Sequence, residues 1–210
     1  MSLRPDNAYE LVQDYEEQFA YRLGREVLHK PETSVWMIVI PILFVHHMYR
    51  VNKYKTGVRS FANGIMAPRK KALNKAFEEI SDQIPDETLP AEEYFPELDT
   101  LPDHDPGLLD RQVQVINIFK SHYRKLLSAN GTTYAELLHE AYPTSQKYKE
   151  FIRKVNHGER DLNQYLAKNI HDSDESRQVV HRLQDQSIQL REEEIHFFYN
   201  QTGKKKRRKG

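Results

Sequence analysis

Residues 109–126, LDRQVQVINIFKSHYRKL, carry the pattern that decides the fold class. Apolar side chains recur there at steps of three and four residues, which places them on one face of an α-helix. The pattern therefore predicts a helix that ends near Asn130 and Gly131. Its apolar positions are Leu109, Val113, Ile116, Phe119, Tyr123 and Leu126.

The same periodicity continues after this helix. Thr133 and Glu136 have the spacing of a capping box, in which a hydroxyl and a carboxylate satisfy backbone N–H groups at a helix start. They predict a short helix that ends before Pro143. Further apolar patterns predict two separate helices over residues 148–158 and 162–170, because a glycine closes the first pattern.

A last, longer helix is predicted after Asp172 and Glu175, which again have capping-box spacing. No convincing alternating β pattern is present. The predicted fold class is all-α, with residues 107–200 as a small C-terminal helical bundle and residues 201–210 as a disordered polybasic tail. The apolar stripe of the last helix includes Val179, Val180, Leu183, Leu190, Phe197 and Phe198.

An N-terminal amphipathic helix is predicted within residues 1–33, spanning roughly residues 7–29. Asn7 and Glu10 have capping-box spacing, and Pro31 ends the pattern. The apolar stripe consists of Val12, Tyr15, Phe19, Leu23 and Val27.

Residues 34–51 contain an uninterrupted apolar run, VWMIVIPILFV, at positions 35–45. A helix over residues 34–49 would be about 24 Å long, which is short against a hydrocarbon core of about 30 Å. A proline in mid-run and aromatic residues at both ends favour a re-entrant or interfacial element. The alternatives are a buried core segment and a subunit interface. The predicted membrane contacts are Val35, Trp36, Ile38, Ile40, Pro41, Leu43, Phe44 and Tyr49.

The formal net charge is zero, from 31 basic and 31 acidic residues, but the charges are segregated. Residues 46–75 carry eight Lys or Arg and no acid, whereas residues 76–106 carry eleven acids and no Lys or Arg. Residues 52–81 are predicted as a basic helical segment, with Pro68 opening a helix at its first turn. The predicted contacts with an anionic surface are Arg50, Lys53, Lys55, Arg59, Lys204, Lys205, Lys206, Arg207, Arg208 and Lys209.

Residues 82–106 are predicted to be an acidic linker, because five of the ten prolines fall there. The linker holds more apolar residues than a pure spacer needs, so we expect them to pack on a neighbouring helical surface. They are Leu89, Tyr94, Phe95, Leu98 and Leu101.

Few residues carry a recognisable chemistry. There is no cysteine, and the phosphate-binding, nucleophile-elbow and zinc-protease motifs are absent. Glu136-x-x-His139 and Glu193-x-x-His196 have the spacing of di-iron ligands, but both pairs are expected on the solvent side of their helices. His46-His47 and Asp103-His104-Asp105 are weak metal-ligand patterns. We expect no cofactor and no bound metal.

These observations predict a non-enzymatic, membrane-associated helical scaffold or adaptor at the cytoplasmic face of a membrane. Residues 34–55 would engage a bilayer with anionic lipid, and the C-terminal helices would bind a protein partner or a second copy. The alternative is a soluble, cytoplasmic all-α interaction protein or oligomer subunit. A metal-carboxylate enzyme is a remote third hypothesis, and nucleic acid is a less favoured partner of the basic tail.

Overall fold

The computed structural model describes residues 5–27, 57–96, 105–169 and 174–200. Within these ranges the chain is helical and has no strand, which confirms the all-α prediction. The helices are α1 (Pro5–Val27), α3 (Gly57–Ser81), α4 (Ala91–Tyr94), α5 (Pro106–Leu127), α6 (Tyr134–Ala141), α7 (Ser145–Asn169) and α8 (Asp174–Ile195). A π-helical turn, His196–Asn200, follows α8 directly.

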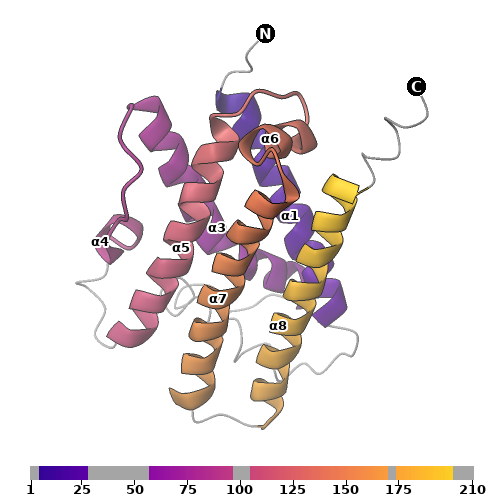
Figure 1. Cartoon of the computed structure of the whole chain (residues 1–210). Helices are drawn as coiled ribbons and strands as arrows, with labels where there is room; N and C mark the ends of the chain where they lie inside the picture. Colours follow the sequence, from indigo (N-terminus) through magenta and orange to yellow (C-terminus); the bar gives the residue numbers. More distant parts are fainter. Residues whose placement is uncertain (1–4, 28–56, 97–104, 170–173, 201–210) are drawn as a thin grey trace.

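The long helices form a ring (Figure 1). Helix α3 packs against α1 and α5, α7 packs against α5 and α8, and α8 packs against α1. Helix α1 runs antiparallel to α3, because Tyr9 contacts Phe77 near one end of the pair while Gly24 contacts Phe61 near the other. Helix α6 contacts both α1 and α5, and the short α4 packs on α5.

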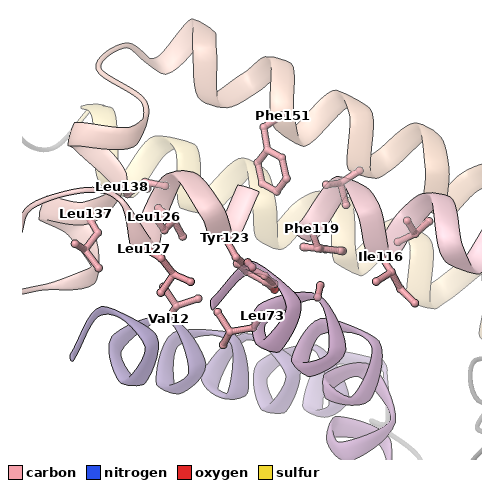
Figure 2. Close-up of a cluster of buried hydrophobic side chains, with 14 of the residues drawn as sticks. Val12, Leu73, Ile116, Phe119, Tyr123, Leu126, Leu127, Leu137, Leu138 and Phe151 are labelled. Carbon is pink, nitrogen blue, oxygen red and sulfur yellow. The ribbon is translucent and has the colours of Figure 1, made fainter. Parts of the chain in front are cut away.

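One apolar cluster fills much of the interior of the ring (Figure 2). It joins Val12 of α1 and Leu73 of α3 to Tyr123 of α5, Leu138 of α6 and Val155 of α7, all of them at most 2% exposed. The stripe predicted from residues 109–126 points into this cluster. The core therefore contains residues from both sides of position 106.

Side-chain caps fix where two of these helices begin. The Asp105 carboxylate accepts hydrogen bonds from the backbone N–H groups of Gly107 at 2.9 Å and Leu108 at 3.2 Å, which starts α5. The Thr133 hydroxyl accepts from the Glu136 N–H at 3.3 Å, so the predicted cap of α6 is confirmed. The Glu136 carboxylate reaches back to the N–H of Thr132 at 2.6 Å.

Three predicted helix boundaries are wrong, the first because α1 begins at Pro5 and Asn7 lies inside it. Pro68 lies inside α3 and does not open it, because buried residues on both sides, Phe61 and Leu73, pack into apolar clusters and hold the helix through the proline. Helix α7 continues through Gly158. A β-carbon at Gly158 would lie 3.2 Å from the Val115 side chain, so this glycine allows α7 to approach α5 closely.

The prediction that Phe197 belongs to the buried stripe of the last helix is also wrong. Phe197 is 58% exposed, whereas Phe198 is 6% exposed. The π-helical turn His196–Asn200 adds residues to the helical turn and so changes which side chain faces the core. Of the apolar residues predicted to pack from the linker, Tyr94 and Phe95 are buried and Leu89 is partly buried against the main cluster. Leu98 and Leu101 lie outside the described residues.

The shared core predicts that a cavity in α3 destabilises the whole bundle. Leu73→Ala removes a side chain that is 2% exposed, and we expect the free energy of unfolding to fall by about 2–5 kcal/mol. Urea titration followed by circular dichroism would measure this fall as one cooperative transition. The control is Ile84→Ala, because Ile84 is 46% exposed and its truncation should cost less than about 0.5 kcal/mol. A separate transition of the C-terminal helices would contradict the shared core.

Candidate functional site

Most of the predicted contact residues lie outside the described part of the chain. These are the predicted membrane contacts from Val35 to Tyr49, together with Arg50, Lys53, Lys55 and Lys204–Lys209. Arg59 is described, and it is exposed near the start of α3. None of the described helices is long and apolar enough to cross a bilayer.

The two ends of residues 28–56 are held side by side. Gly24 near the end of α1 lies so close to α3 that a β-carbon there would be 3.1 Å from Phe61 and 3.3 Å from Val58. Val27 and Phe61 also belong to one apolar cluster, together with Val179 and Leu183 of α8. The described residues that flank residues 28–56 therefore lie at the same end of the bundle.

Residues 201–210 follow from the opposite end of the bundle. The Tyr199 hydroxyl donates to the Tyr142 carbonyl at 2.7 Å, and Phe198 packs against Tyr134 of α6. Val179, near the end that holds Val27, lies 19 residues before Phe198. At the rise of an α-helix this separation is roughly 28 Å. The predicted basic segment of residues 52–81 and the predicted basic tail of residues 201–210 therefore adjoin opposite ends of the bundle.

The residues of the two Glu-x-x-His sequences contact different parts of the bundle and do not come together at one site. The Glu136 carboxylate caps α6, and His139 lies edge-on to Tyr199. Glu193 is exposed and pairs with Arg22 at 3.1 Å. In the described ranges no three His, Asp or Glu side chains lie close enough to hold a metal ion. In the sequence Asp103-His104-Asp105, Asp105 caps α5. The other residues of the two weak metal-ligand patterns, His46, His47, Asp103 and His104, lie outside the described residues.

Charged side chains do meet inside the bundle. Arg69 of α3 is 5% exposed and pairs with Glu16 of α1, which is also 5% exposed. The guanidinium carbon of Arg69 lies 4.7 Å from the ring centres of both Phe19 and Phe119, which is the geometry of cation–π contacts. Burial is the largest influence and lowers the pKa of Arg69, but Glu16, Tyr123 and Glu159 together outweigh it, so the pKa is raised.

A second ion pair joins α8 to α7. Arg191, which is 3% exposed, binds both carboxylate oxygens of Glu159 at 2.7 Å and the Asn156 amide oxygen at 2.7 Å. Burial is the largest influence and raises the pKa of Glu159, but Arg191, together with Arg69 and Ser187, outweighs it and the pKa is lowered. Glu159 is therefore ionised at neutral pH.

Glu194 near the end of α8 has no such partner. Its carboxyl group accepts hydrogen bonds from the hydroxyls of Tyr15 and Tyr148. Burial, and to a smaller extent the nearby Glu16, raise the pKa of Glu194 to about 7. A proton therefore equilibrates on this buried group near neutral pH.

A cavity of about 310 Å³ lies beside the Arg69 and Glu159 pairs. It is enclosed by α3, α5, α7 and α8, with Leu23 of α1 on its wall, and most of the lining is apolar. Asn163 of α7 and Ser187 of α8 are buried polar residues on the same wall. An apolar pocket with a few inward polar groups is the usual form of a small-molecule site, so this cavity is the candidate functional site.

Reading the sequence for apolar periodicity found apolar residues of this site, such as Ile116, Phe119 and Leu183, but missed its buried polar and charged residues. Such reading counts Glu16, Arg69 and Asn163 as polar and assigns them to the solvent face. One signal was present, since Glu16 directly follows Tyr15 and stands four residues after Val12 on the predicted apolar stripe of α1. A charged residue at a core-facing position indicates a buried partner of opposite charge.

The buried carboxyl of Glu194 predicts a specific pH dependence of stability. Its pKa rises from the ordinary value of 4.5 to about 7 on folding, so the folded protein binds more protons between these pH values. This contribution is fully present below pH 4.5 and is lost as the pH rises through 7. We expect it to be on the order of 3 kcal/mol. In Glu194→Gln, which stays neutral, the free energy of unfolding should fall less between pH 5 and pH 8 than in the wild type.

The control is Glu193→Gln, the same substitution at the exposed neighbouring residue, which should keep the wild-type pH dependence. His122 acts in the opposite direction, because burial lowers its pKa and its contribution is lost as the pH falls below 6.5. His122 is present in all three proteins and cancels in the comparison. Equal pH dependence in Glu194→Gln and the wild type, measured by urea unfolding at each pH, would contradict the assignment.

Comparison with known proteins gives no relative for this chain. No family model, no curated protein and no solved structure matches it. The function proposed below therefore rests on the residues, contacts and charges of this chain alone.

Proposed function

We propose that this chain is a non-enzymatic, membrane-associated scaffold or adaptor. In this proposal residues 34–55 contact the bilayer at the cytoplasmic face of a membrane, and the C-terminal helices face a protein partner. The carrying observation is the contact between the end of α1 and the start of α3, which holds both ends of residues 28–56 at one end of the bundle. A bilayer at that end could be reached by the apolar run while the helices stay folded.

The energetics of the apolar run support this contact. The eight Val, Ile, Leu and Phe residues among positions 35–45 are worth roughly −2.5 to −5 kcal/mol at the centre of a bilayer. Cations close to anionic lipid add about 1 kcal/mol each. Arg59, exposed near the start of α3, stands at the same end of the bundle as Val27. This position of Arg59 supports the proposal, which needs positive charge at that end.

The basic tail has a different place in the proposal. It starts roughly 28 Å along α8 from the end that holds Val27. Ten residues reach at most about 35 Å when fully extended, so the tail could meet the same bilayer only when stretched. We therefore assign the contact with lipid to residues 34–55. In the proposal, the basic tail contacts an anionic surface at the other end of the bundle.

Flotation of the full-length protein with lipid vesicles tests the membrane contact. Wild-type protein should float with vesicles that contain phosphatidylserine and stay bound at high salt, because salt screens only the electrostatic part of binding. Ile40→Asp combined with Leu43→Asp should release it, since each charge costs about 2.5–3.5 kcal/mol near the bilayer centre. The matched control places the same charges at exposed apolar residues of the bundle, Ile84→Asp with Phe197→Asp, and should still float.

Wild-type protein that stays monodisperse without detergent and does not float with the vesicles would contradict the membrane proposal. If the Ile40 and Leu43 variant then unfolds or aggregates, the run is a core segment or a subunit interface, as the soluble alternative requires. Circular dichroism of each variant distinguishes this loss of fold from a loss of lipid binding.

The cations of the basic segment should contribute only to the electrostatic part of the binding energy. Replacing Lys53, Lys55 and Arg59 with Gln should weaken binding to phosphatidylserine vesicles by about 3 kcal/mol at low salt. Binding to neutral phosphatidylcholine vesicles should be unchanged, because these residues contribute through charge. An equal loss on both kinds of vesicle would show that the three residues support the fold instead.

A further inference from the structure

The cavity beside Arg69 has the size and lining of a ligand site. Its volume is about 310 Å³, whereas an apolar cavity of about 150 Å³ is large enough to bind benzene. Helix α3 contributes the small residues Gly64 and Ala67 to the wall, and this leaves space where the facing helices contribute large ones. The large apolar residues of the wall include Leu23, Ile65, Ile116, Phe119, Leu162 and Leu183.

Asn163 supplies an independent indication of a ligand. It is 7% exposed and stands on the cavity wall. Its side-chain amide makes no hydrogen bond with any group in the part of the chain that the structure describes. Its amide atoms are not among the fully buried side-chain atoms that lack a partner, so they stay accessible from the cavity, and they offer two donors and one acceptor. A molecule in the cavity could therefore hydrogen-bond to this amide.

Pro68 removes one helical hydrogen bond beside the cavity. Proline has no N–H, so the Gly64 carbonyl lacks the donor that the residue four positions later normally provides in a helix. Gly64 and Pro68 both line the cavity, so this change in the helical hydrogen bonding lies next to the proposed site.

The charges around the cavity decide the charge of the ligand. Arg69 is paired with Glu16, and Glu159 is paired with Arg191. The two buried charges of the wall, Arg69 and Glu159, are thus compensated by protein groups, whereas Lys70 and Lys71, which also line the cavity, are exposed and half-buried. A charged ligand among the buried residues of the wall would bring a charge without a buried counter-ion, which is costly in an apolar environment.

We propose that this cavity binds an uncharged, mainly apolar small molecule whose single polar group hydrogen-bonds to the side chain of Asn163. The site uses α3, α5, α7 and α8, and it does not depend on residues 34–55. The proposal therefore goes beyond membrane contact and stands or falls separately from it.

Fluorescence titration of the full-length protein with N-phenyl-1-naphthylamine tests the proposal. This probe is neutral and apolar, carries one N–H group, and becomes brighter in apolar surroundings. We expect saturable binding at one site. We also expect 1-naphthol, which is neutral at pH 7, to displace the probe at a concentration at least tenfold lower than 1-naphthoate, which is anionic. Failure of the wild type to bind the probe, or a preference for the naphthoate, would overturn the proposal.

Two variants locate the bound probe. Asn163→Leu removes the amide and should weaken binding about tenfold, which is the effect of losing one hydrogen bond to a buried amide. Its matched control is Asn63→Leu, the same change at an exposed position of α3, which should bind like the wild type. Ala67→Phe fills the cavity and should abolish binding.

Thermal unfolding of each variant separates loss of the site from loss of the fold. The probe should raise the melting temperature of the wild type and of Asn63→Leu, because a ligand that binds only the folded state stabilises it. It should leave the melting temperature of folded Ala67→Phe unchanged. Unchanged affinity in both Asn163→Leu and Ala67→Phe would place the probe elsewhere and overturn the proposal.

Discussion

The ion pair between Glu16 and Arg69 fixes how the first two long helices meet the rest of the bundle. Arg69 projects from α3 to a carboxylate of α1 and lies over a ring of α5, Phe119. Because both charges are buried, separating them leaves an uncompensated charge, which costs about 3–5 kcal/mol. Helices α1, α3 and α5 can therefore slide or rotate very little without losing this contact.

A second buried cation orders the segment that follows α3. Lys120 of α5 has no exposed surface and donates to Glu79 at 2.6 Å, to Asp86 at 3.1 Å and to the Glu87 carbonyl at 2.7 Å. Asn117, one helical turn earlier, holds both backbone groups of Leu89 at 2.9 Å. The proline-rich stretch up to α4 is thus held through hydrogen bonds from α5 and not through a helix of its own.

The sequence predicted those features that depend on apolar periodicity and local capping. The stripe of residues 109–126 and the cap at Thr133 lie where expected, because both depend on neighbours within one turn. Pro68 and Gly158 were misread because local propensity opposes a helix there and tertiary packing overrides it. The cavity was invisible to pattern reading, since it depends on which small residue of α3 faces which large residue of another helix.

The close approach of Gly24 to Val58 and Phe61 has a consequence for chain entropy. When two ends are held together, the entropic cost of the connection grows only with the logarithm of its length, about 0.6 kcal/mol for each doubling. Residues 28–56 could therefore lengthen or shorten with little effect on the stability of the helices that they join. The need to close the chain between α1 and α3 therefore does little to constrain the length or the composition of residues 28–56.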